Sequence, residues 1–222
     1  MGKMLELTAS DGHKFGAYRA DPAGKPKGAV VVIQEIFGVN NHIKRTTDGF
    51  AAKGYVAIAP ALFDRAKKDI QLGYDADAIA QGRDIRGKVG DEGPLKDIQA
   101  AIDSVKGAGK IATVGYCWGG TLAFLSATRL HGITAAVGYY GGGIAGAAGE
   151  KPNVPTMLHF GDKDASIPMT DVEKVKAARK DTTIYVYPAG HGFNCDERGS
   201  YDATSAKQAL DRTMTFLAQQ IG

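Results

Sequence analysis

The feature that most limits the possible folds is a series of short apolar runs separated by segments with helical spacing. These runs are AVVVIQEIFG (residues 29–38), YVAIAPAL (55–62), KIATVGY (110–116), ITAAVGYYG (133–141), PTMLHFG (155–161) and TTIYVYPAG (182–190). Unbroken β-branched runs are typical of strands buried on both faces of a parallel sheet. The intervening helices supply the right-handed crossovers that such a sheet needs. We therefore expect an α/β fold with a mostly parallel central sheet and helices on both faces.

The expected helices cover residues 40–54, 93–109, 119–130, 169–180 and 200–221. Gly54 closes the first as a glycine C-cap would, and Pro94 stands near the start of the second. At the N-terminus, Asp11-Gly12 joins two strand-like segments and predicts an antiparallel hairpin. Residues 64–93 are polar and mixed, and one or two short helices over the sheet edge are expected there. Without an evident linker, residues 1–222 are expected to form a single domain.

Bulk properties exclude several classes of protein. The formal net charge is only +3, and lysines and arginines are scattered, which argues against nucleic-acid binding. No apolar run approaches the ~20 residues of a membrane span, and the N-terminus lacks the features of a signal peptide. The two cysteines, Cys117 and Cys195, lack the spacing of a disulfide framework or a local metal motif. We expect a cytoplasmic monomer without metal or cofactor.

The segment GGGIAG (residues 141–146) fits the glycine fingerprint of dinucleotide-binding proteins and follows an expected strand. That fingerprint also requires a helix that begins at the glycines. Here AAGEKPNVP follows, which is too short and too rich in proline before the next strand. A flexible loop is the better interpretation, and a nucleotide-dependent oxidoreductase is disfavoured.

The sequence GYCWGG between an expected strand and an expected helix has the G-x-Nu-x-G pattern of a nucleophile elbow. Cys117 occupies the position where serine is common. A helix N-terminus beneath the sulfur favours negative charge there and so favours the reactive thiolate. Alone, this pattern leaves a buried and inert cysteine as an alternative.

Partners for such a nucleophile follow in the chain order nucleophile, acid, histidine. Asp162 and Asp164 follow one strand, and His191 lies in a glycine-flanked loop after the last strand. All fall at carboxyl ends of strands, where open α/β sheets place their sites. One of the two aspartates is expected only to stabilise its turn. None of the other histidines, His13, His42, His131 and His159, has the required position.

Glu35 closes the first buried strand, where an unpaired charge would be costly. The alternative is a strand end that faces solvent. The same loop would supply the Ile36 backbone N–H, which with the N–H of Trp118 would form an oxyanion hole.

Taken together, QEIFG, GYCWGG, AVGYYG, GDKDASIP and AGHGF resemble the dienelactone hydrolase family of α/β-hydrolases, in register from about residue 5 to the C-terminus. The resemblance implies that Cys117 is the nucleophile, His191 the general base and Asp164 the acid that orients it. It implies that Glu35 contacts the resting thiol and controls its release as thiolate. The implied reaction is the opening of a lactone such as dienelactone to maleylacetate through a thioester, without a cofactor, in aromatic-compound degradation.

The family's named substrate is an anion, and its carboxylate needs cationic partners. An arginine is expected four positions after the catalytic histidine, but Cys195 stands there and is interpreted as a bystander. Arg83, Arg86 and Arg198 are candidates for this role, and Phe37 is a further candidate for substrate contact. Because the expected arginine is missing, a general esterase or thioesterase on other small acyl compounds remains an alternative. A non-catalytic relative that serves as a binding protein is disfavoured, since every member of the triad is present.

Overall fold

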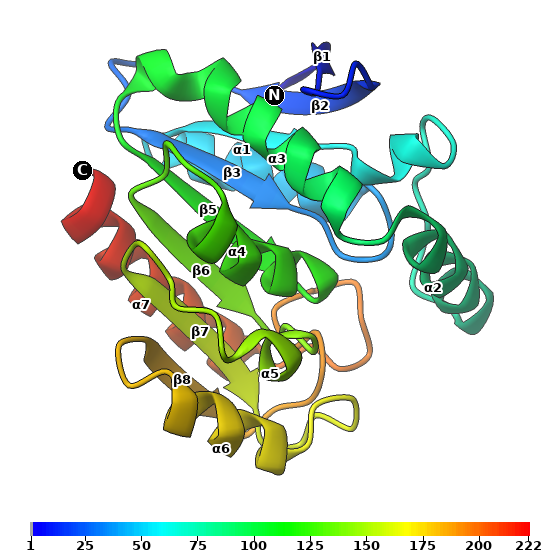
Figure 1. Cartoon of the computed structure of the whole chain (residues 1–222), viewed down its shortest axis with the longest axis vertical. Coiled ribbons are helices and arrows are strands. Elements are labelled where there is room, and N and C mark those ends of the chain that lie inside the picture. The colour runs from blue at the N-terminus through cyan, green and yellow to red at the C-terminus, as the bar shows by residue number, and fades with distance from the viewer. Residues whose placement is uncertain (1) are drawn as a thin grey trace.

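The computed structural model describes residues 2–222. Its strands form one sheet in the order β1-β2-β4-β3-β5-β6-β7-β8, drawn in Figure 1. The strands are β1 (Lys3–Thr8), β2 (Lys14–Ala20), β3 (Ala29–Ile33), β4 (Val56–Pro60), β5 (Ile111–Tyr116), β6 (Ala135–Tyr139), β7 (Thr156–Gly161) and β8 (Thr183–Tyr187). β1 pairs antiparallel with β2, and β2 with β4, whereas the pairs from β4 to β8 are parallel. The predicted α/β architecture with an N-terminal antiparallel hairpin is confirmed.

Helices cover both faces of the sheet (Figure 1). α1 and α7 lie on one face, and α3, α4, α5 and α6 lie on the other. The helices are α1 (Asn41–Ala52), α2 (Ala76–Val89), α3 (Glu92–Val105), α4 (Trp118–Arg129), α5 (Ile144–Ala147), α6 (Met169–Ala178) and α7 (Ala203–Ile221), with 3₁₀ turns at Leu62–Arg65 and Lys106–Ala108. None of these helices is long and apolar enough to cross a bilayer.

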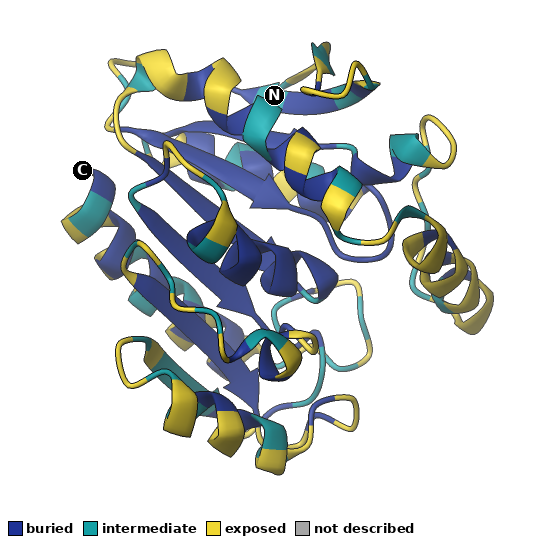
Figure 2. Ribbon diagram, in the orientation of Figure 1, coloured by how far each residue is buried: buried dark blue, intermediate teal, exposed yellow. Residues whose placement is uncertain are grey.

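Two sequence expectations need correction. Residues 64–93 do not hold only short helices, because α2 runs for 14 residues and stands out from the end of the sheet (Figure 1). Its residues are mostly exposed, so it has little of the apolar periodicity that would have announced it (Figure 2). Within GGGIAG, the chain forms the single helical turn α5 rather than a flexible loop.

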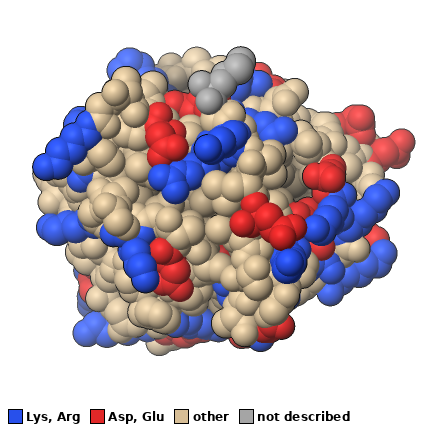
Figure 3. Space-filling view, turned by 90° about the horizontal axis from the view of Figure 1, so that it is seen from above, with Lys and Arg blue, Asp and Glu red and all other residues tan. Residues whose placement is uncertain are grey.

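The core follows from the uniform apolar runs. Every residue of β3, β4, β5, β6 and β7 is buried, as Figure 2 shows for the centre of the sheet. On the face seen in Figure 3, basic and acidic side chains are interspersed, with no broad area of one sign. Burial of both sheet faces leaves the loops at the carboxyl ends of the strands as the place for polar chemistry.

His159 is a polar side chain within this core, on β7. Its ring nitrogens lie 2.8 Å from the Tyr187 hydroxyl and 3.1 Å from the Thr213 hydroxyl. Burial, assisted by the charge of Arg212, lowers the pKa of His159 to about 3. The folded protein therefore holds a neutral imidazole.

We expect this histidine to make the protein less stable in acid. Between pH 6.5 and the folded pKa of about 3, His159 is protonated in the unfolded chain but stays neutral in the folded protein. The free energy of unfolding therefore falls by roughly 1.4 kcal/mol for each pH unit in this range. The measurement is urea unfolding of the wild type and of His159→Gln between pH 7 and pH 4.5. The difference in stability between the two should shrink as the pH falls. Parallel pH profiles would contradict the expectation.

Candidate active site

Cys117 lies at the turn between β5 and α4, with φ of 56° and ψ of −119°. A positive φ is strained for a residue with a Cβ atom, and the flanking glycines make the turn possible. A Cβ at Gly115 would overlap the carbonyl of Gly119, and a Cβ at Gly119 would overlap the carbonyl of Ile33. The two glycines thus allow β5 and α4 to lie close together, so that the tight turn between them places the sulfur of Cys117 at the carboxyl edge of the sheet.

The chain brings His191 and Asp164 to this sulfur. The Nε2 atom of His191 lies 3.1 Å from Cys117 Sγ, and its Nδ1 atom lies 2.8 Å from Asp164 Oδ2. The other Asp164 oxygen accepts the backbone N–H groups of Ser166 and Ile167, at 2.8 and 3.2 Å. Asp164 is therefore the aspartate that the structure joins to the histidine, and Asp162 is exposed.

The electrostatics of His191 favour a charged pair with the sulfur. Burial lowers the pKa of this imidazole, but the hydrogen bonds and negative charges of Asp164 and Cys117 outweigh it and raise the pKa to about 10. An imidazolium beside a sulfur at a helix N-terminus stabilises the thiolate.

Two residues that line the cavity with Cys117 have backbone amides with free hydrogen-bonding capacity. Trp118 is the first residue of α4, and Ile36 follows β3. Neither N–H donates a hydrogen bond to another residue within 2–222. The side chain of Trp118 is held by its indole N–H, which donates to Asp91 at 2.7 Å. Both residues line the cavity that contains Cys117.

Glu35 is buried, with 1% of its surface exposed, so the solvent-facing alternative is wrong. Its carboxylate accepts a hydrogen bond from Arg198 Nη1 at 3.0 Å and one from the Tyr74 hydroxyl at 3.3 Å. The guanidinium of Arg198 also lies over the rings of Phe37 and Tyr74. In this structure, then, the charge of Glu35 is matched by Arg198, while the thiol of Cys117 faces His191.

A cavity of about 390 Å³ surrounds the sulfur. The candidates for substrate contact all line it: Phe37, Arg83, Arg86 and Arg198. Arg83 and Arg86 come from one face of α2. That helix approaches the active-site loop closely because Gly82 packs on the Ile36 carbonyl, where a Cβ would overlap the oxygen.

Two tyrosines in the site were not identified from the sequence. Tyr74 binds Glu35, and Tyr140 packs edge-on against His191 with ring centroids 5.2 Å apart. Tyr140 has a φ of 39°, another strained position beside the site. The sequence signal for Tyr140 was the YYG that ends an apolar run, whereas Tyr74 lies in the polar segment without any signal.

Cys195, the second cysteine, has surroundings that do not favour reactivity. Cys195 is fully buried. Burial, followed by the charge of Glu35, raises the pKa of its thiol to about 11. A protonated and inaccessible thiol is a poor nucleophile.

Comparisons with known proteins agree with this geometry. The sequence matches the dienelactone hydrolase family over residues 15–221. The chain belongs to the dienelactone hydrolase family. It is 32% identical to a carboxymethylenebutenolidase from Pseudomonas putida over 96% of this chain and 95% of that protein. It is 36% identical to a candidate carboxymethylenebutenolidase from Synechocystis, over 94% of this chain and 93% of that protein.

A solved structure supports the same membership. A candidate dienelactone hydrolase from Klebsiella pneumoniae superposes with a TM-score of 0.84 at 32% identity, covering 98% of this chain and 99% of that one. An esterase from Pyrococcus furiosus, at 14% identity and a TM-score of 0.75, shares the fold. As a member of this family, the protein is a hydrolase that acts on carboxylic ester bonds, and a small ester or lactone fits it as substrate.

Proposed function

We propose that the protein opens a small lactone, of the dienelactone type, through a thioester on Cys117. The observation that carries the proposal is the unbroken pair of contacts from sulfur to imidazole to carboxylate, at 3.1 and 2.8 Å. A nucleophile, a base within hydrogen-bond reach and a third group that orients the base are the requirements of covalent catalysis.

In the first step the Cys117 thiolate attacks the lactone carbonyl carbon. The carbonyl oxygen becomes an oxyanion that accepts the free N–H groups of Ile36 and Trp118. Collapse of this intermediate breaks the ring C–O bond, and the enolate oxygen leaves with a proton from the His191 imidazolium. The acyl group then remains on sulfur as a thioester.

In the second step His191, now neutral, removes a proton from a water that attacks the thioester. The second oxyanion uses the same two amides, and its collapse breaks the C–S bond. The thiolate and the imidazolium are restored, and the new carboxylic acid of the product releases its proton to solvent to become a carboxylate. For dienelactone, the enol product tautomerises to maleylacetate.

Glu35 serves as the group that controls the thiol. Its carboxylate is buried beside the site and is free to exchange partners, because Arg198 and Tyr74 are its only hydrogen-bond partners among residues 2–222. When a substrate anion held by Arg83 also draws Arg198 toward it, the carboxylate of Glu35 loses its counter-charge. It can then accept the proton of the Cys117 thiol and pass it to His191, which gives the thiolate and the imidazolium of the first step.

Replacing Glu35 tests this role. Glu35→Gln keeps the side-chain volume but removes the charge, so we expect turnover to slow by about tenfold or more, the value of a hydrogen bond to a charged group. Circular dichroism should show a fold like the wild type. Glu173→Gln, an exposed acid on α6, is the matched control. An unchanged kcat in Glu35→Gln would remove Glu35 from the mechanism.

Among the three arginines, Arg83 is the best candidate to hold a substrate carboxylate. Arg198 is already paired with Glu35, and Arg86 lies 3.9 Å from Asp91. Arg83 has no ion-pair or hydrogen-bond partner among residues 2–222, yet it lines the cavity with Cys117. A free cation in the same cavity as the nucleophile favours an anionic substrate over a neutral ester.

The experiment that tests the proposed function compares kcat/KM on cis- and trans-dienelactone with kcat/KM on p-nitrophenyl acetate. Arg83→Ala should lose 10- to 100-fold on dienelactone, roughly the value of a charge-assisted hydrogen bond, and little on the neutral acetate. Lys88→Ala removes the same charge from α2 outside the cavity and is the matched control. Equal losses on both substrates would argue against carboxylate binding. Acetate turnover without dienelactone turnover would favour the general esterase.

A further inference from the structure

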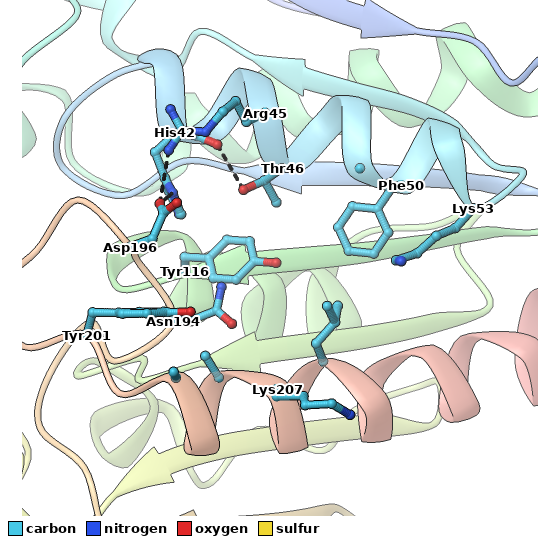
Figure 4. Close-up of a pocket in the computed structure, with 14 residues that line it drawn as sticks. His42, Arg45, Thr46, Phe50, Lys53, Tyr116, Asn194, Asp196, Tyr201 and Lys207 are labelled. Carbon is cyan, nitrogen blue, oxygen red and sulfur yellow. Dashed lines mark hydrogen bonds and ion pairs between the residues drawn. The ribbon is translucent and has the colours of Figure 1, made fainter.

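A second cavity, of about 400 Å³, lies between α1 and α7, on the face of the sheet that these two helices cover (Figure 4). His42, Tyr116 and Asp196 are among the residues that line it. It contains neither Cys117 nor His191, so it is distinct from the catalytic cavity. His42 connects this cavity to a buried cluster of side chains.

The cluster consists of Glu35, His42 and Cys195. One ligand atom of each lies within 4.8 Å of the others, and the three residues are 1%, 5% and 0% exposed. They come from three separate segments: the loop after β3, the first turn of α1 and the loop before α7. A carboxylate, an imidazole and a thiol thus meet in the interior.

The two ring nitrogens of His42 differ in their contacts. Its Nδ1 lies 3.3 Å from Asp196 Oδ1, and Arg45 fixes the same oxygen at 2.9 Å, as the dashed lines in Figure 4 mark. With its proton on Nδ1, the ring leaves a lone pair on Nε2. That atom is buried and has no hydrogen-bond partner among residues 2–222. An unpartnered buried acceptor is unfavourable, and a bound cation would remove that cost.

A carboxylate on one ring nitrogen and a metal on the other is the usual arrangement of metal-binding histidines. Thiolate and imidazole ligands favour Zn²⁺ over Mg²⁺ and Ca²⁺, which prefer oxygen. We propose that Glu35, His42 and Cys195 bind a Zn²⁺ ion, with Asp196 holding His42 in place and a water in the fourth position.

Charge and geometry are compatible with this site. On binding, Cys195 loses its proton to solvent and Arg198 turns away from Glu35, so that the thiolate and the Glu35 carboxylate together neutralise the two charges of the metal. Bonds of about 2.0 to 2.3 Å place tetrahedral ligand atoms about 3.5 Å apart. Ligand atoms that lie within 4.8 Å of one another therefore need side-chain shifts on the order of 1 Å.

The site adjoins the catalytic cavity through Glu35. The same carboxylate accepts the hydrogen bond of Arg198, which lines that cavity. A metal on Glu35 therefore competes with Arg198 for this carboxylate. The proposal does not depend on the proposed lactone hydrolysis, because binding can be measured in a protein without the nucleophile.

The test uses Cys117→Ala, in which Cys195 is the only thiol of the chain. Titration with Co²⁺, a spectroscopic substitute for Zn²⁺, should give a thiolate-to-cobalt charge-transfer band that saturates at one equivalent and disappears when Zn²⁺ is added. Cys117→Ala/Cys195→Ser should lose the band. Asp196→Asn should weaken binding about 10- to 100-fold, the usual effect of removing the partner of a ligating histidine.

His42→Gln in the same background should also weaken binding at least tenfold, whereas His131→Gln, at an exposed histidine just after the end of α4, should not. Circular dichroism of each variant checks the fold. If the Cys195→Ser protein does not fold, the Co²⁺ affinities of the His42→Gln and Asp196→Asn proteins test the site instead. No charge-transfer band at saturating Co²⁺, or a band that survives Cys195→Ser, would overturn the site. Equal affinities for His42→Gln and His131→Gln would overturn it as well.

Discussion

Cys117→Ala is expected to lower kcat/KM on both dienelactone and p-nitrophenyl acetate by about 10⁴- to 10⁶-fold, because members of a catalytic triad act as one unit. Removing the sulfur leaves His191 and the two amides in place but removes the atom that attacks the carbonyl. Steady-state kinetics on both substrates measures the loss. Mass spectrometry of rapidly quenched wild-type enzyme should detect the acyl group on the peptide that contains Cys117.

The matched control is Ser126→Ala, which also removes a single heavy atom from a small side chain and lies in the second half of α4. Ser126 donates to the Leu122 carbonyl within α4 and has no contact with the cavity. It should retain activity close to the wild type. Turnover in Cys117→Ala like that of the wild type, or an acyl group on another residue, would exclude the thioester mechanism.

The sequence predicted the fold well where side-chain periodicity decides the structure. Uniformly apolar runs became the buried strands, and the helix after GYCWGG begins at Trp118, directly after the nucleophile position. The order of Cys117, Asp164 and His191 along the chain was also sufficient to place them at one edge of the sheet. This worked because all the carboxyl ends of parallel strands meet at the same edge.

Contacts between distant loops could not be derived in this way. The pairing of Glu35 with Arg198 joins residues 163 positions apart, and nothing in either local sequence specifies it. The position of Arg83 depends on the closeness of α2 to the Ile36 carbonyl at Gly82, a contact of backbone atoms. Helix α2 itself is mostly exposed, so it has too little apolar pattern to reveal which face meets the site.

The three proposed metal ligands likewise cannot be recognised from the sequence. Motif spacing detects ligands only when they lie close together in the sequence, and Cys195 has no such neighbours. The fold brings Cys195 to Glu35 and His42 from segments more than 150 residues away in the chain. The sequence therefore predicts that Cys195 is a bystander and that His42 does not have the position of a catalytic histidine.

Asp164→Asn is the second change for which we expect a large loss, on the order of 10³- to 10⁴-fold in kcat. Asp164 Oδ1 is held by the N–H groups of Ser166 and Ile167. An asparagine must keep its carbonyl oxygen on those donors, so its NH₂ group faces His191 Nδ1. The imidazole then has to accept at Nδ1 and carry its proton on Nε2, where it cannot take the proton of Cys117 or of water.

The same substitution removes the negative charge that raises the pKa of His191 toward 10, so the imidazolium should lose its proton at lower pH. A thiolate paired with that imidazolium loses its counter-charge as well, and the ultraviolet absorbance of the thiolate should fall at neutral pH. Asp162→Asn, an exposed aspartate two residues earlier, is the matched control and should change neither kcat nor the absorbance. If the two variants behave alike, Asp164 only stabilises its turn, and His191 must be oriented by its loop and by the ring of Tyr140.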